Sequence, residues 1–77
     1  MAENFFPEGT MVLIEVGNRC IEGRVLAYHH LHHLYRIKVI KGGELDLTPY
    51  FRAEQGFEHV FYVPEANIKP FQDFSRV

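Results

Sequence analysis

The sequence has very little cysteine, no tryptophan and no long apolar run. Its single cysteine, Cys20, cannot form an intrachain disulfide, which excludes the disulfide framework of many small secreted domains. No stretch approaches the roughly 18 consecutive apolar residues of a membrane-spanning helix. The first residues lack a basic stretch followed by an apolar one, so we expect no secretory signal. These absences favour a cytoplasmic protein without a membrane contact.

Positive charge is also scarce. Eight Lys and Arg residues stand against ten Asp and Glu residues, which gives a formal net charge of −2 with neutral histidines. Nucleic-acid binders usually carry clustered cationic residues, and the densest group here is Arg36, Lys38 and Lys41. Arg36 and Lys38 are predicted to share one strand face, either as a solvated strip or as a weak anion-binding surface. We therefore expect a protein partner or a second copy of the chain, and not nucleic acid.

The sequence shows no arrangement typical of catalysis. Cys20 falls in a predicted strand, where a packed thiol is more common than a reactive one. Gly42-Gly43 indicates a turn and lacks the spacing of a phosphate-binding loop. An enzyme pocket usually measures several hundred cubic ångströms, and the interior of one small barrel does not hold it. We expect no catalytic residues, no cofactor and no enzymatic activity, unless several chains assemble.

Apolar side chains, by contrast, are plentiful: 47% of the 77 residues are hydrophobic and 14% are aromatic. This content is enough for a packed core and argues against disorder. A core of this size leaves some apolar surface to face a partner. We expect a single domain over residues 1–77, with a lead-in at 1–8, an insert loop at 44–58 and a tail at 72–77.

Alternating apolar and polar residues predict five strands, at 10–16, 20–29, 34–41, 59–63 and 68–71. The alternation places these side chains on the inner face of a sheet: Val12, Ile14 and Val16; Ile21, Gly23, Val25 and Ala27; Tyr35, Ile37 and Val39. Proline at the start of residues 64–67 predicts a single 3₁₀ turn before the last strand. The predicted fold is all-β, a small five-stranded barrel.

The insert at 44–58 is too long for an ordinary hairpin loop between strands three and four. We predict a helical turn within it, over 50–55. Tyrosine and arginine are frequent at the centres of protein interfaces. The insert and the second strand therefore supply the residues of a predicted partner-binding surface: Tyr50, Phe51, Arg52, Phe57 and Tyr28. Alternatively, Phe51 and Phe57 cap the barrel and extend its core.

Four histidines occur within five residues, at His29, His30, His32 and His33. Neutral imidazole is a ligand of Zn²⁺ and Ni²⁺, so this cluster is a candidate metal site or a point of adventitious metal pickup. The alternative is an exposed polar loop, because neighbouring residues of a strand point to opposite faces. A further hypothesis is a response to pH, since imidazoles gain charge between about pH 7 and pH 5.

Four stretches carry a resemblance to a known fold: Gly-Thr-Met-Val at 9–12, Cys-Ile-Glu-Gly-Arg-Val-Leu at 20–26, Tyr-Arg-Ile-Lys-Val-Ile at 35–40 and Val-Pro-Glu-Ala-Asn-Ile-Lys-Pro at 63–70. In this order the chain resembles the SH3-like barrels, and its local sequence is similar to their Tudor group. Tudor-type readers hold methylated lysine or arginine in an aromatic cage. The matching positions lie near Glu15, Glu22, Ile40 and Gly43, and none is aromatic.

A second resemblance is to the plasmid-type dihydrofolate reductases, short SH3-like chains that assemble as a tetramer around one pore. Their fourth-strand signature, Val-Gln-Ile-Tyr, corresponds here to Val60-Phe61-Tyr62-Val63, which lacks the glutamine and the Ile-Tyr pair in register. We expect a non-enzymatic interaction module or accessory subunit that binds a protein partner or itself. The alternatives are an oligomeric reductase-like enzyme and a weak Tudor-like reader of methyl marks or nucleic acid.

Overall fold

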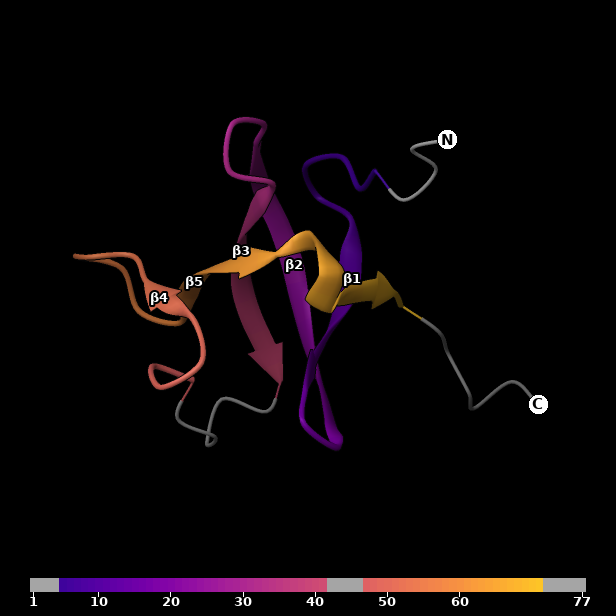
Figure 1. The fold of residues 1–77 in the computed structure, drawn as a ribbon, viewed down its shortest axis with the longest axis vertical. Helices are drawn as coiled ribbons and strands as arrows, with labels where there is room; N and C mark the ends of the chain where they lie inside the picture. Colours follow the sequence, from indigo (N-terminus) through magenta and orange to yellow (C-terminus); the bar gives the residue numbers. More distant parts are fainter. Residues whose placement is uncertain (1–4, 42–46, 72–77) are drawn as a thin grey trace.

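The structure, a computed structural model, describes residues 5–41 and 47–71. In this part of the chain six strands and one short 3₁₀ helix follow one another: β1 (Met11–Val16), β2 (Arg19–His29), β3 (Leu34–Lys41), β4 (Arg52–Ala53), β5 (Val60–Pro64), η1 (Glu65–Asn67) and β6 (Ile68–Pro70). The strands form one antiparallel sheet in the order β4-β5-β3-β2-β1-β6 (Figure 1). The all-β prediction is therefore confirmed.

Some expectations fall on residues that the structure does not describe. The first half of the lead-in, the start of the insert and the tail lie outside the described residues, at 1–4, 42–46 and 72–77. In the described ranges, no helix has the length and apolar character needed to span a bilayer. The cytoplasmic location stays a prediction.

The sheet has six strands where the sequence predicts five, because β4 lies inside the insert. The helical turn predicted over 50–55 is wrong. The backbone N–H groups of Tyr50 and Phe51 both donate to the Leu47 carbonyl, at 2.9 Å each, so the turn ends at Phe51. The chain then pairs with β5, and the Glu54 N–H donates to the Val60 carbonyl at 2.8 Å.

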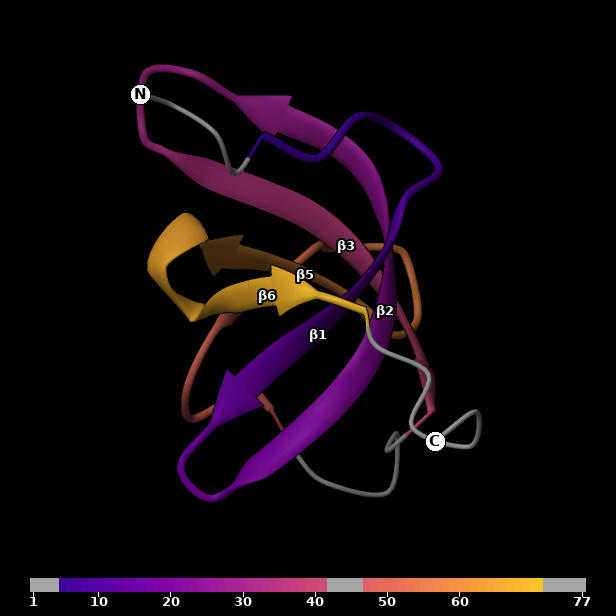
Figure 2. The same ribbon diagram turned by 90° about the vertical axis from the view of Figure 1, so that its right-hand side faces the viewer.

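The predicted closed barrel is likewise corrected to a coiled, open sheet. Among the described strands, no backbone pairing joins β6 to β4 or β5, and β4 and β6 stand at the two ends of the strand order. The three residues of η1 nevertheless connect β5 directly to β6 (Figure 2), so the sheet must coil strongly between them. The 3₁₀ turn itself is confirmed, and the Asn67 side chain anchors it to β1 by donating to the Glu15 carbonyl at 2.9 Å.

The inner face of the coiled sheet carries the core. On β1, every second residue is buried, as the alternation predicts. Leu47 and Phe51, from the turn before β4, complete the core cluster, and Phe6 of the lead-in packs against it. The buried members of the cluster are Val12, Ile14, Val16, Ile21, Val25, Tyr35, Ile37, Val39, Leu47, Phe51, Val63 and Ile68. Phe6 contacts the cluster at Tyr35, with ring centroids 5.9 Å apart, and its backbone N–H donates to the Tyr35 hydroxyl at 3.0 Å.

Two register shifts interrupt the pairing of β2 with β3. Between Glu22 and Gly23 the partner on β3 changes from Lys41 to Val39, which leaves Ile40 as an extra residue on β3. The second shift leaves Leu26 as an extra residue on β2, because Val25 pairs with Ile37 and Ala27 pairs with Arg36. An extra residue bends a strand and increases its twist, so these two bulges help to coil the sheet.

The bulge at Leu26 also corrects the predicted face of Ala27. The alternation puts Ala27 on the inner face with Val25, but the extra residue reverses the order beyond it. Ala27 lies opposite the outward-facing Arg36, while Tyr28 lies opposite the buried Tyr35, with ring centroids 4.6 Å apart. The next residue, His29, is thereby placed on the outer face of the sheet.

Gly23 lies on the inner face of β2, where there is no room for a side chain. A Cβ atom at this position would lie 2.5 Å from the Ile37 Cγ2 atom and 3.2 Å from the Lys38 carbonyl oxygen. We expect Gly23→Ala to lower the free energy of unfolding by about 1–3 kcal/mol through overpacking. The thermal midpoint, followed by circular dichroism, should fall by at least about 4 °C. Glu22→Ala, one residue away and facing outward, is the control; an equal midpoint for both variants would contradict the close approach.

Candidate functional site

The outer face of the sheet carries a row of side chains that crosses three strands. Backbone pairing sets Arg36 of β3 beside Tyr62 of β5, and Tyr62 beside Arg52 of β4. Directly paired residues of an antiparallel sheet project to the same face, so an aromatic ring lies between two guanidinium groups. This row is the base of the candidate site.

Glu54, just after β4, ties the row together. The Tyr62 hydroxyl donates a hydrogen bond to Glu54 Oε1, and Arg36 Nε donates to the same oxygen at 3.4 Å. The Arg36 guanidinium also lies 5.3 Å from the centroid of the Phe57 ring, within the range of a cation–π contact. Three side chains from β3, β5 and the segment after β4 are therefore held in one arrangement.

The hydrogen bond between Tyr62 and Glu54 shifts the pKa values of both groups, in the directions expected for a phenol that donates to a carboxylate. It holds the pKa of Glu54 below its usual range, and the positive charge of Arg36 acts in the same direction. The same bond raises the pKa of Tyr62 above the usual value of a phenol, and partial desolvation adds to this effect. At neutral pH Glu54 is therefore ionised and Tyr62 is protonated.

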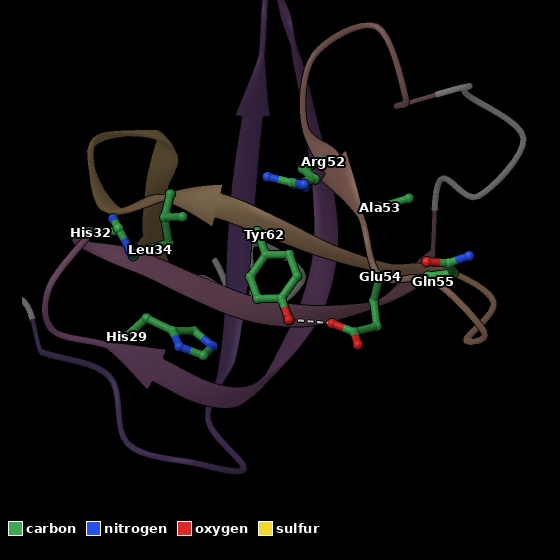
Figure 3. Close-up of a pocket in the computed structure, with 8 residues that line it drawn as sticks. All are labelled: His29, His32, Leu34, Arg52, Ala53, Glu54, Gln55 and Tyr62. Atoms are coloured by element: carbon green, nitrogen blue, oxygen red, sulfur yellow. Dashed lines mark hydrogen bonds between the residues drawn. The ribbon is translucent and has the colours of Figure 1, made fainter.

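An open cleft of about 410 Å³ lies over Tyr62 (Figure 3). Its walls come from the β2–β3 turn on one side and from β4 with the two residues after it on the other. The lining residues are His29, His32, Leu34, Arg52, Ala53, Glu54, Gln55 and Tyr62. The His29 ring stands 5.3 Å from the Tyr62 ring, and Figure 3 shows the Arg52 side chain extending above Tyr62 towards the turn.

The cleft combines an apolar base with groups that carry or acquire positive charge. Leu34 and the Tyr62 ring supply the apolar surface, while Arg52, His29 and His32 supply the cationic groups. Glu54 is the single acidic residue of the lining, and its charge is matched by Arg36. Within residues 5–41 and 47–71, Arg52 makes no ion pair. This arrangement is suited to an anionic group attached to an extended or apolar body.

The predicted partner-binding residues are dispersed by the fold. Arg52 lines the cleft, and Phe57, 57% exposed, stands beside it through its contact with Arg36. Tyr50 is 60% exposed on the turn before β4. Phe51 is only 8% exposed and belongs to the core, as in the alternative interpretation of the insert. Tyr28 lies outside the cleft lining and packs on the core cluster through Tyr35.

The four histidines are also separated. His29 and His32 line the cleft, whereas His30 packs its ring edge-on against Tyr28 at 4.9 Å. The His33 Nδ1 atom lies 3.3 Å from the Tyr28 hydroxyl, which donates to Glu65 at 3.1 Å. In the part of the chain that the structure describes, no three His, Cys, Asp or Glu side chains come together as a metal site. The metal prediction therefore gains no support from the geometry.

Sequence reasoning missed Tyr62 and Glu54, the two residues around which the site is built. The β5 strand carries no clean alternation, since Val60 and Val63 are both buried although they are three residues apart. Only the pairing of Tyr62 with Arg36 shows which face its side chain occupies. For Glu54 the sequence offers only its place two residues after Arg52, in a loop that carries both acidic and basic residues.

Comparison of the chain with models of protein families, with curated proteins and with solved structures finds no match. No relative therefore supplies an activity or a binding residue. The function has to be argued from the cleft and the strands that form it.

The bond between Tyr62 and Glu54 can be tested by removing the hydroxyl alone. In Tyr62→Phe, we expect the pKa of Glu54 to rise towards its usual value, measured by NMR titration of the carboxyl carbon. The stability that this low pKa contributes is present above the unfolded value of about 4.3 and is lost as pH falls through the folded value. Tyr62→Phe should therefore lose less stability on acidification than the wild type. Tyr50→Phe, which removes a hydroxyl outside this network, is the control. If the pKa of Glu54 were the same in Tyr62→Phe as in the wild type, the bond would be ruled out.

Proposed function

We propose that this chain is a non-enzymatic interaction domain related to the SH3-like barrels, and that it binds a protein partner at the cleft over Tyr62. The observation that carries the proposal is the position of the cleft: it opens beside β4, a strand only two residues long at the edge of the sheet. The element order supports the SH3-like relation, since β1, β2, β3, β5, η1 and β6 follow the expected sequence of strands with a 3₁₀ turn before the last.

Among residues 5–41 and 47–71, the backbone of β4 has one position without a pairing partner. In an antiparallel pair, successive residues direct their N–H and C=O groups alternately to the two sides of the strand. Glu54 directs its N–H to Val60 on β5, so Ala53 directs its own backbone groups to the open side. An extended segment of a partner can pair there, as in other complexes formed by strand addition.

The other edge of the sheet is less suited to this kind of binding. The outer strand there is β6, which ends at Pro70, and proline has no N–H to donate. Side chains around β4 add recognition beyond the backbone. Tyr50 and Phe57 expose aromatic surface, and arginine and tyrosine carry much of the binding energy at many interfaces.

The proposal is tested by removing two exposed side chains that the core does not need. We expect Tyr50→Ser with Arg52→Gln to keep the wild-type thermal midpoint but to weaken partner binding by about tenfold or more, equivalent to about 1.4 kcal/mol. Proteins retained on immobilised wild-type chain would be identified by mass spectrometry, and the affinity of each purified candidate measured by calorimetry.

The matched control is Phe71→Ser with Arg19→Gln, which also removes an exposed aromatic and an exposed arginine, neither of which lines the cleft. A partner bound equally by both double variants would place its binding surface elsewhere. Sedimentation of the wild-type chain distinguishes self-association: a dimer that the cleft variant dissociates would make the partner a second copy of this chain.

A further inference from the structure

We propose that the ligand of the cleft is an acidic, extended segment of a partner protein, whose carboxylates bind among Arg52, His29 and His32. The inference rests on the proposed function and specifies the chemistry of the partner. Three observations carry it: the balance of charge in the cleft, the direction of the Arg52 side chain (Figure 3), and the backbone position at Ala53, which is unpaired among the described residues.

The cleft is positive although the whole chain is not. The chain has a formal net charge of −2, yet the lining combines three groups that carry or acquire positive charge with one carboxylate. That carboxylate, Glu54, already accepts hydrogen bonds from Tyr62 and Arg36. The guanidinium of Arg52 is left without a carboxylate among the described residues. A carboxylate of the ligand would complete this charge arrangement with a geometry that arginine favours.

The backbone of β4 explains why the carboxylate should belong to an extended segment. Arg52 and Ala53 are adjacent, so a strand that pairs at Ala53 runs directly beside Arg52. Paired side chains on one face of a sheet have Cβ atoms about 4.5–5.5 Å apart. A glutamate or aspartate on the outer face of the added strand therefore comes within reach of the Arg52 guanidinium. A free anion would make the charge contact but not the backbone contact.

The two imidazoles make this binding depend on pH. Imidazole is the side chain that gains positive charge on mild acidification, and His29 and His32 bring two such groups to the cleft. The groups that share the cleft with them are Tyr62 of β5 and Glu54 and Arg52 from the β4 segment, and Arg36 of β3 pairs with Glu54. His33, in the same turn, and Glu65 of η1 contact the Tyr28 hydroxyl instead. The electrostatic attraction of His29 is one of the smaller effects that lower the pKa of Glu54. The carboxylates of an acidic segment stay ionised at pH 6 and attract a positively charged imidazole.

The experiment uses a fluorescent peptide of alternating glutamate and valine, and its counterpart with glutamine for glutamate. At pH 6 we expect the wild-type chain to bind the glutamate peptide at least about tenfold more tightly than the glutamine peptide. At pH 8 we expect the affinity for the glutamate peptide to be at least about threefold lower, because the imidazoles lose their charge. Anisotropy measures both affinities. A single-stranded oligothymidylate serves as the third probe.

Variants separate the contributions of the three cationic groups. Arg52→Gln should weaken binding of the glutamate peptide at both pH values, and Arg19→Gln, which removes the same charge from the β1–β2 turn, should not. His29→Gln with His32→Gln should remove the gain at pH 6. His30→Gln, in the same turn but outside the cleft lining, should keep it. Circular dichroism confirms that each variant is folded.

Each contrary result overturns a defined part of the inference. Equal binding of the glutamate and glutamine peptides would refute the acidic ligand while leaving the cleft as a peptide site. Tighter, steeply salt-dependent binding of the oligothymidylate would assign the cleft to nucleic acid. No binding of either peptide would refute the acidic segment, and the proposed function would still stand or fall by the partner test with Tyr50 and Arg52. A pH gain retained without His29 and His32 would refute the role of the imidazoles.

Discussion

The single extra residue at Leu26 is the constraint on which the rest of the outer face depends. It reverses the alternation of β2, so that Tyr28 joins Tyr35 towards the core and His29 turns outward to Tyr62. Without it, His29 would continue the inner face of Ile21, Gly23 and Val25, and the cleft would lose one wall. A β-bulge normally serves to bend a strand or to redirect a side chain, and here one bulge does both.

A second determinant of the shape of the cleft is the Glu54 carboxylate, which accepts hydrogen bonds from Tyr62 and Arg36. Glu54 comes from a loop segment, whereas Tyr62 and Arg36 stand on paired strands in the middle of the sheet. The two hydrogen bonds therefore fasten the loop wall to the rigid part of the fold. They also engage the Glu54 carboxylate, the one acidic group of the lining. The other lining groups therefore determine the electrostatic character of the cleft. A loop that is positioned in this way can present Arg52 at a fixed place without a longer strand.

The sequence predicts the parts of this fold in which one pattern dominates. On β1 the strict alternation of Val12, Ile14 and Val16 is confirmed, and Pro64 marks the 3₁₀ turn. Prediction from sequence is wrong where several neighbouring residues are of one kind: Leu26, Ala27 and Tyr28 are all apolar, so a β-bulge leaves no trace in the hydrophobic pattern. For the insert, the prediction is wrong for a different reason. Phe51 and Phe57 are the same residue type in one loop, and only the turn at Leu47 decides that the first is buried.

The departure from a closed barrel leaves β4 and β6 as the edges of the sheet in the described part of the chain. A fully closed sheet pairs every strand on both sides and leaves no edge for an added strand. Here the sheet coils far enough for η1 to connect β5 with β6, yet its end strands stay unpaired in the described residues. The two edges differ in chemistry, because Pro70 removes a donor from β6 whereas Ala53 keeps both backbone groups on β4. Arginine beside the open position discourages indiscriminate strand pairing, since charged residues on an edge repel apolar strands. The same charge attracts a strand of opposite charge, so one residue can serve both protection and recognition.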